Sequence, residues 1–417
     1  MRGAPDWERA MGMEVYASES PPCGGRAKVL DGDFVVEESV SFSGLTQESA
    51  PGYYPLYRVE KRSIDTLHLE AELARALGSR VSYGGLKDKR AVAVQYFTAT
   101  GRSPRKRETV EGRNFRATLV GYVPKPIARG SIIGNRFGIT LRGCGPATAS
   151  AVEEVFGLAE RRLLPNFFGH QRFGVRGART SDVGRAMVKE EFEEATRLVL
   201  CGWRGEEGGE GAAAREAFAD GRYGEGMAML SPGQDTERAV AASLAKDPLD
   251  HVGALRAIPI RLRKLFVHAY QSLLFNRAIS LALGRGLDIS AYQPGDNWAD
   301  GVGGRIHGVK EHAPDGAVPV AQIPGYAYRD YGSRFDALVS EVLSSDGSRA
   351  GDFYVKRMQE VSAEGGFRVP HLVTSNLSSE FDGRDAVLRF ALARGQYATV
   401  ILREVMKPGD PRELGVS

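Results

Sequence analysis

Asp88 is the first candidate for a catalytic residue, because its carboxylate and its cationic neighbours could support a reaction. It stands in the run GGLKDKR beside Lys87, Lys89 and Arg90, and it is the only Asp or Glu within residues 80–107. These cations would keep the carboxylate ionised and attract phosphate groups. An ionised carboxylate can act as a nucleophile or as a base. The same tripeptide is also common in a solvated turn, so the residues alone leave both interpretations open.

A second candidate site lies within residues 165–174 (PNFFGHQRFG), where adjacent aromatics stand among polar side chains. An aromatic ring offers a flipped nucleic-acid base a face to stack on, and polar groups such as Asn166 can bond its edge. Arg172 could bind phosphate. The alternative is that Phe167 and Phe168 form a hydrophobic plug beneath a loop, or that Phe167 alone does so.

Charge is distributed unevenly along the 417 residues, although 55 Lys and Arg against 52 Asp and Glu give a net charge of only +3. Residues 80–185 hold 20 basic and 7 acidic residues, a local charge of +13, which leaves −10 for the remainder. Residues 186–247 carry 7 basic and 13 acidic residues. Clustered cations attract polyanions even when the whole chain is nearly neutral. A nucleic-acid partner is one explanation, and a surface that disperses these charges is the other.

Several classes of protein are excluded by composition. The three cysteines lie far apart without a CxxC pair, which excludes a disulfide scaffold and fits a reducing compartment. The seven histidines lack the spacing of a zinc site, so no metal is predicted. The longest charge-free run, residues 316–328, contains two prolines and is too short to span a bilayer. With no secretory signal at the N-terminus, we expect a cytoplasmic protein of two or more domains.

Hydrophobic patterns predict the elements that must position the candidate residues. Strands or other regular structure are expected at residues 34–36, 81–83, 91–100, 114–123, 136–141, 387–392 and 397–406, and helices at 64–77, 147–163 and 263–283. Ser63 is expected to cap the first helix and Leu67 to lie on its apolar face. Thr180 or Ser181 would cap a further helix. Residues 186–257 are predicted to form an inserted helical or loop-rich region.

Three segments resemble signatures of the TruD family of tRNA pseudouridine synthases. Residues 83–95 (YGGLKDKRAVAVQ) resemble its GxKDxxAxTxQ signature, residues 166–174 (NFFGHQRFG) its NYFGxQRFG signature, and residues 396–406 (QYATVILREVM) its YATxxLRE pattern. Weaker echoes occur at residues 33–38 (DFVVEE) and 269–276 (AYQSLLFN). All five follow the family's order along nearly the whole chain. Two positions depart from the signatures, since Ala stands at 93 for Thr and Phe at 167 for Tyr.

The resemblance implies roles for individual residues. Asp88 would be the catalytic aspartate, acting while the N1–C1′ bond of a uridine is broken and the uracil is rejoined through C5. Phe168 would stack on the target uracil, and Asn166 would hold the active-site loop and Asp88. Lys28 would be a basic residue close to the aspartate, although an exposed lysine at a strand start is the alternative. Four cations are expected to bind RNA: Lys87, Lys89, Arg90 and Arg172.

The resemblance also implies a fold and a substrate. The fold would be α+β, with a mixed, largely antiparallel sheet in the catalytic domain and an inserted α+β TRUD domain. We place the catalytic domain in residues 1–185 and 366–417 and the insertion in residues 186–365. The substrate would be a U13-type uridine in the D-arm of certain tRNAs, flipped within a basic cleft. No cofactor is implied, and a monomer is expected.

Two other functions fit the same residues. A non-catalytic RNA-binding protein could use the basic region without any reaction, and replacing Asp88 would then leave its function unchanged. A different Asp-dependent enzyme could act on the glycosidic bond of a nucleoside or sugar. In that enzyme the basic charge would be incidental, and high salt would scarcely affect the rate.

Overall fold

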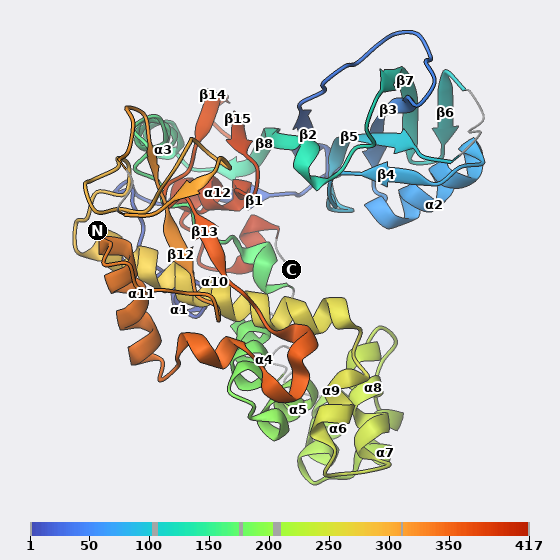
Figure 1. Cartoon of the computed structure of the whole chain (residues 1–417), viewed down its shortest axis with the longest axis vertical. Coiled ribbons are helices and arrows are strands. Elements are labelled where there is room, and N and C mark those ends of the chain that lie inside the picture. Colours follow the sequence, from blue (N-terminus) through green and yellow to red (C-terminus); the bar gives the residue numbers. More distant parts are fainter. Residues whose placement is uncertain (1, 102–106, 175–177, 203–209, 310–311, 416–417) are drawn as a thin grey trace. The chain divides into compact units, whose positions relative to one another are not determined.

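Figure 1 shows the computed structural model of the chain. It describes residues 2–101, 107–174, 178–202, 210–309 and 312–415. The chain divides into two compact units. The sheet unit consists of Ser18–Leu164 and Leu372–Ser417, and the helical unit of Met1–Ala17 and Pro165–His371.

The chain passes from the sheet unit to the helical unit after Leu164 and returns to the sheet unit after His371. The sequence analysis places the domain bounds after residues 185 and 365 instead. Those functional bounds stay a prediction. The first residues of the chain join the helical unit because α10 (Ile260–Gly284) bonds their main chain. Asn276 donates to the carbonyl oxygen of Met11 at 3.0 Å, and Ser280 to that of Gly12 at 2.7 Å.

The sheet unit is built on one ten-stranded sheet. Its strands are β1 (Gly24–Ala27), β2 (Phe34–Val40), β3 (Tyr54–Arg62), β4 (Val81–Tyr83), β5 (Val92–Ala99), β6 (Thr109–Gly112), β7 (Phe115–Val123), β8 (Ile132–Cys144), β14 (Thr374–Phe381) and β15 (Ala386–Ala393). Its helices are α2 (Thr66–Leu77), α3 (Thr148–Glu160) and α12 (Ala398–Met406), with short 3-10 turns η1 (Asp31–Asp33), η2 (Arg129–Ser131) and η6 (Pro411–Leu414). The strand order is β14-β15-β8-β2-β5-β3-β7-β6, with β1 paired to β8 and β4 to β5.

The direction of the strands confirms the predicted fold class. Among the strand pairs of the described residues, β2 and β5 run parallel and the others antiparallel. Val35 lies opposite Val92 in the parallel pair. Because β4 and β5 are antiparallel neighbours in this sheet, the chain must reverse its direction within residues 84–91, which connect them. That turn contains Asp88.

Helix α2 covers part of this sheet through a buried leucine stripe. Leu69, Leu73 and Leu77 have no exposed surface and pack with Val59 and Phe97 of the adjoining strands. Their spacing of four residues places them on one face of the helix. Burial of three leucines on strand residues fixes the helix against the strands that carry the Asp88 turn.

The start of α2 differs from the prediction. The Asp65 carboxylate, not the Ser63 hydroxyl, caps the helix and accepts from the main-chain N–H groups of Leu67 and His68 at 3.0 Å each. The Ser63 hydroxyl instead donates to Asp31. Leu67 is 51% exposed, so its predicted place on the apolar face is wrong. It lies two residues before Leu69, which turns it about 200° away from the leucine stripe.

The helical unit is organised around α10, which confirms the helix predicted at residues 263–283. Its other helices are α1 (Asp6–Arg9), α4 (Ala178–Val188), α5 (Phe192–Cys201), α6 (Glu210–Ala219), α7 (Tyr223–Ala228), α8 (Asp235–Leu244), α9 (His251–Arg256) and α11 (Arg334–Ser345), with 3-10 turns η3 (His170–Phe173), η4 (Ala350–Phe353) and η5 (Lys356–Val361). Its strands are β9 (Trp298–Ala299), β10 (Ile306–His307), β11 (Val318–Pro319), β12 (Ala321–Ile323) and β13 (Gly366–Arg368). Helices α5 to α9 confirm helical structure in the described part of residues 186–257.

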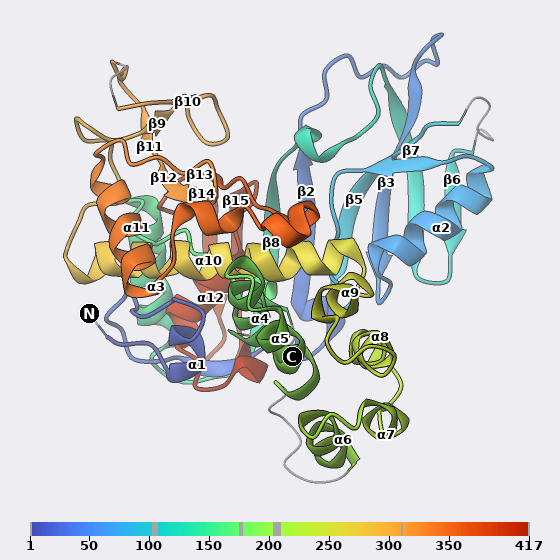
Figure 2. The ribbon, with the colours of Figure 1, turned by 60° about the horizontal axis from the view of Figure 1, so that its bottom comes forward.

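Helices α4 and α10 lie side by side in both ribbon views (Figure 1, Figure 2). A glycine permits this contact, because a Cβ atom added at Gly184 would lie 2.0 Å from the main-chain oxygen of Phe266. Helix α4 begins at Ala178, before Thr180 and Ser181, so neither residue caps it as predicted. In the described part of the chain, every helix is too short or too polar to span a bilayer.

Candidate active site

The loop between β4 and β5 presents Asp88 beside a buried lysine. The Nζ atom of Lys28 donates to Oδ2 of Asp88 at 2.8 Å, and it also lies 4.4 Å from the centre of the Phe34 ring. The Lys28 side chain is 6% exposed, whereas that of Asp88 is 50% exposed. Lys28 is therefore not the exposed lysine of the alternative interpretation. A buried ammonium needs a partner, and Asp88 supplies one while half of its own surface remains open to solvent.

Polar side chains hold the main chain of this loop from the protein side. Lys87 donates its main-chain N–H to Oγ1 of Thr66 at 2.9 Å, and the Thr66 hydroxyl donates to Gln95 at 3.0 Å. The Gln95 amide donates in turn to the carbonyl oxygen of Gly85 at 2.9 Å. Thr66 and Gln95 are buried. The loop is thus held at two points before Asp88, Gly85 and Lys87. Gln95, the last residue of the segment YGGLKDKRAVAVQ, therefore has a structural role.

The side chain of Lys87 points to a buried carboxylate. Its Nζ atom lies 2.8 Å from Oε1 of Glu38, whose side chain has no exposed surface, and the Lys87 side chain is 13% exposed. Oε2 of Glu38 also accepts from the main-chain N–H of Tyr96 at 3.2 Å. This geometry favours a structural role for Lys87 over the phosphate binding expected from the sequence, because removing it would leave a buried charge without its cation.

Replacing Lys87 should therefore cost stability. We expect Lys87→Met to lower the free energy of unfolding by about 3 kcal/mol, since it leaves the Glu38 carboxylate buried without a counter-ion. Chemical denaturation followed by circular dichroism measures this change.

Lys89 is the matched control, because Lys89 and Arg90 are exposed on the same loop. Lys89→Met should change the free energy of unfolding by no more than about 0.5 kcal/mol. It should instead reduce the salt dependence of RNA binding by about one unit of slope, the contribution of one phosphate contact. A stability loss shared equally by both variants would contradict the structural role of Lys87.

In the helical unit, α10 fixes the main chain of Phe168. The buried side chain of Asn276 accepts from the Phe168 N–H at 2.8 Å and donates to its carbonyl oxygen at 3.0 Å. The Phe168 ring meets the edge of the Phe275 ring at 5.4 Å and is 8% exposed, whereas Phe167 has no exposed surface. Phe167 is therefore a core residue of this unit, and Phe168 retains a small accessible area.

Arg368 of β13 connects Phe168 with Asn166. Its guanidinium donates to Oδ1 and to the main-chain oxygen of Asn166 at 2.6 and 2.9 Å, and lies 4.2 Å from the centre of the Phe168 ring. The Asn166 amide donates to the carbonyl oxygen of Val369 at 2.9 Å. Arg172 bonds the Ser272 hydroxyl at 3.3 Å and lies 5.7 Å from the Phe168 ring. The structure thus gathers Asn166, Phe168 and Arg172 in the helical unit, and Lys28 and Asp88 in the sheet unit.

The model of the family described as tRNA pseudouridine synthase D (TruD) matches residues 10–405 of the chain. The chain belongs to this family. That assignment confirms the resemblance seen in the sequence and the predicted enzyme class, since pseudouridine synthases are isomerases.

Several relatives match this TruD-family chain over most or all of its length. A protein of Pyrobaculum arsenaticum assigned as a tRNA pseudouridine synthase D is 32% identical over 432 residues, which cover 100% of both chains. One of Methanopyrus kandleri with the same assignment is 33% identical over 366 residues, covering 85% of this chain and 86% of the relative. A crystal structure from Methanosarcina mazei, likewise assigned as TruD, matches with a TM-score of 0.81 and 26% identity. It covers 99% of this chain and 100% of that one, and it confirms the α+β fold.

Sequence reasoning missed Arg368 and Asn276 as supports of the TruD signature residues. Arg368 lies 202 residues after Asn166, and Asn276 lies 108 residues after Phe168. Asn276 ends the segment AYQSLLFN, to which the sequence analysis gives no catalytic role. The echo of a family motif there was the available signal, and it ends on a residue that bonds the main chain of Phe168.

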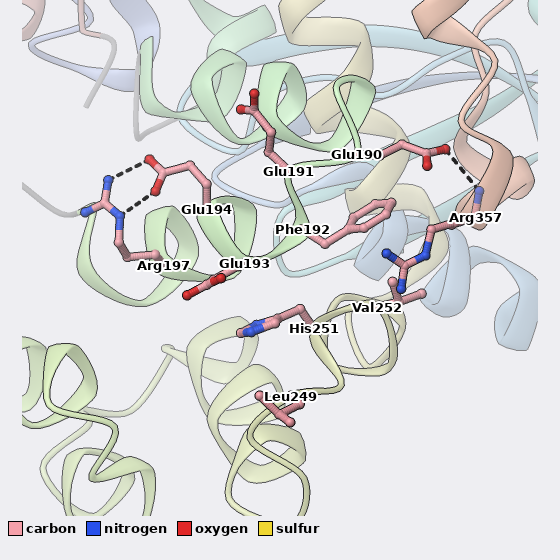
Figure 3. A pocket seen from close by; sticks show the side chains of 10 residues that line it. All are labelled: Glu190, Glu191, Phe192, Glu193, Glu194, Arg197, Leu249, His251, Val252 and Arg357. Carbon is pink, nitrogen blue, oxygen red and sulfur yellow. Dashed lines mark hydrogen bonds and ion pairs between the residues drawn. The ribbon is translucent and has the colours of Figure 1, made fainter.

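A pocket of about 490 Å³ opens elsewhere in the helical unit, beside α5 and α9 (Figure 3). Phe192, Leu249 and Val252 form its apolar part, and four glutamates also line it: Glu190, Glu191, Glu193 and Glu194. Arg197 pairs with Glu194, and the Glu190 carboxylate accepts from the main-chain N–H of Arg357 at 3.1 Å. The excess of carboxylates makes this pocket unsuited to phosphate. Among the described residues, no group of three or more His, Cys, Asp or Glu could hold a metal ion.

Proposed function

We propose that this TruD-family protein converts a uridine of tRNA into pseudouridine, with Asp88 as the catalytic carboxylate. The Lys28–Asp88 ion pair carries this assignment. A solvated turn would not need a buried lysine directed at its carboxylate, whereas a catalytic carboxylate must stay ionised and oriented. The names of the relatives support tRNA as the substrate, and the U13-type position in the D-arm rests on the family resemblance.

The reaction is an isomerisation in which every atom is accounted for. The N1–C1′ bond of the uridine breaks, the uracil turns, and C5 forms the new bond to C1′. The proton on C5 leaves to solvent, and N1 gains one. Asp88 could act as a nucleophile at C1′ or at the base, or as a base on the sugar, and each role requires its ionised form. Lys28 donates to Oδ2 of Asp88 at 2.8 Å and so fixes the orientation of the carboxylate.

The exposed cations beside Asp88 supply a means of holding the RNA. Lys89 and Arg90 extend from the loop into solvent, where they can neutralise phosphates on either side of the target. In the helical unit, the Phe168 ring supplies an aromatic face for a flipped uracil, and Arg172 a further cation. The protein would work in the cytoplasm, where the tRNA substrate is found.

The experiment that tests this function uses a tRNA transcript labelled with tritium at C5 of uracil. The wild-type protein should release the label to water in proportion to the pseudouridine formed, because the C5 proton must leave before the reaction is complete. Retention of all label during prolonged incubation, together with tight tRNA binding, would favour a non-catalytic RNA-binding protein. Release from a free nucleoside at the same rate as from tRNA would favour a glycosyl enzyme that does not need the polyanion.

A further inference from the structure

Lys61, the penultimate residue of β3, is a buried cation beneath the Asp88 loop. Its Nζ atom donates to the main-chain oxygens of Asp88 and Ile64 at 2.7 Å each and lies 3.4 Å from that of Lys87. The residue is 1% exposed. Its partners in the described part of the chain are all main-chain oxygens. Lys61 thus ties two consecutive carbonyl groups of the loop to the connection between β3 and α2.

An ammonium group in this position is costly for folding. Burial removes its hydration and lowers the pKa of Lys61 to about 8. Asp88 and Asp65 act in the opposite direction by attraction, and Lys87 adds to the lowering by repulsion. An apolar side chain at the end of β3 would avoid this cost, so packing of the strand does not explain the lysine. What the lysine supplies is a set of bonds to the main chain of the reactive loop.

We propose that Lys61 is a positioning residue for the isomerisation, which holds the Asp88 main chain so that its carboxylate meets Lys28. This inference rests on the proposed function. Two lysines then fix Asp88 from different sides: Lys28 bonds the carboxylate and Lys61 bonds the main-chain oxygen of the same residue, each within 2.8 Å. Misplacement of a reacting group by about 1 Å can reduce a rate strongly, so support of this kind acts on turnover rather than on substrate binding.

The rate of the reaction should therefore depend on whether Lys61 is protonated. A protonated lysine has three N–H donors for the three oxygens, whereas a neutral one has two and lacks the added strength of a charged donor. Lysine loses its proton as the pH rises, so kcat should fall as the pH passes through about 8. Below that pH the group is charged and the loop is fully held.

The test compares kcat and KM for tritium release from labelled tRNA between about pH 6 and pH 10, the range that spans this titration. We expect Lys61→Met to lower kcat by about tenfold at neutral pH with little change in KM, the equivalent of one lost charge-assisted hydrogen bond. Its remaining activity should lack the decline near pH 8. Lys61→Arg keeps a cation that does not titrate in this range, so its decline should move to higher pH. Titration of the RNA itself would affect every variant alike.

Lys407 provides a matched control in the same unit. It is also buried, and its Nζ atom bonds the Ser18 hydroxyl and the main-chain oxygen of Glu404 at 2.8 Å each, away from the Asp88 loop. Lys407→Met should lose thermal stability yet retain the wild-type pH profile. If Lys61→Met does not fold, Lys61→Arg still decides the question. An Arg variant whose alkaline decline coincides with that of the wild type, or a Met variant with wild-type kcat, would overturn the inference. A wild-type protein that releases no tritium would overturn the proposed function, and this inference with it.

Discussion

Asp88→Ala and Asp88→Asn should each reduce tritium release from labelled tRNA by at least about 10³-fold, the scale of loss when a nucleophile or a general base is removed. The Asn variant is the sharper of the two. Its amide oxygen can still accept from Lys28, which would otherwise be a buried ammonium without a partner. It removes the charge and the reactive oxygen and leaves the size of the side chain unchanged. Loss of turnover in Asp88→Asn would therefore report chemistry and not a collapsed loop.

Binding and stability distinguish this expectation from its rivals. Filter binding should give tRNA affinities within a few-fold of the wild type for both variants, because Lys89 and Arg90 remain in place. Glu111 supplies the control carboxylate, since it is 68% exposed in the same unit and faces only Arg116 at 3.5 Å in the described structure. Glu111→Gln should retain wild-type release. Full turnover by Asp88→Ala would sink the assignment of the catalytic residue.

Local patterns in the sequence predicted most of the elements that carry the site, because each pattern reflects a local physical preference. The β-branched run at residues 91–100 became β5, and the leucine spacing at residues 69–77 became the buried stripe of α2. The cap of that helix was predicted two residues too early. Ser63 and Asp65 are both good N-cap residues, and only the path of the chain after β3 decides which of them reaches the free N–H groups.

The support of the site could not be predicted in the same way. The sequence indicated Asp88 by its motif, and the family resemblance placed Lys28, 60 residues before it, close to the aspartate. Lys61, which lies 27 residues before Asp88 and bonds its main-chain oxygen, was not predicted. No local pattern in the sequence marks a contact such as that of Lys61, because its bonds go to main-chain oxygens of a loop that is distant along the chain. Lys87 shows a different limit of sequence reasoning. Its place in a cationic run suggested RNA binding, whereas the buried Glu38 carboxylate binds its ammonium group.

The second large effect is expected for Phe168 in the helical unit. We expect Phe168→Leu to lower kcat/KM for tRNA by about 10- to 100-fold, because stacking of one base on an aromatic ring contributes about 1–3 kcal/mol. Leucine keeps apolar volume against Phe275 and removes the flat face. The phenylalanine ring has no titratable group, so the loss of kcat/KM should be independent of pH. Tritium release under subsaturating tRNA measures it.

Phe167→Leu is the control that makes this measurement specific. Both phenylalanines are buried, so each leucine variant should lose a similar amount of stability, about 1 kcal/mol, and remain folded at 25 °C. Phe167 has no exposed surface with which to meet a substrate, whereas Phe168 retains 8% and lies against the guanidinium of Arg368. The Arg368 guanidinium packs on the Phe168 ring and holds it in place. The uracil would stack on the part of the ring that stays exposed. If the two variants lose catalytic rate equally, the ring of Phe168 supports the fold of its loop and does not stack on the uracil.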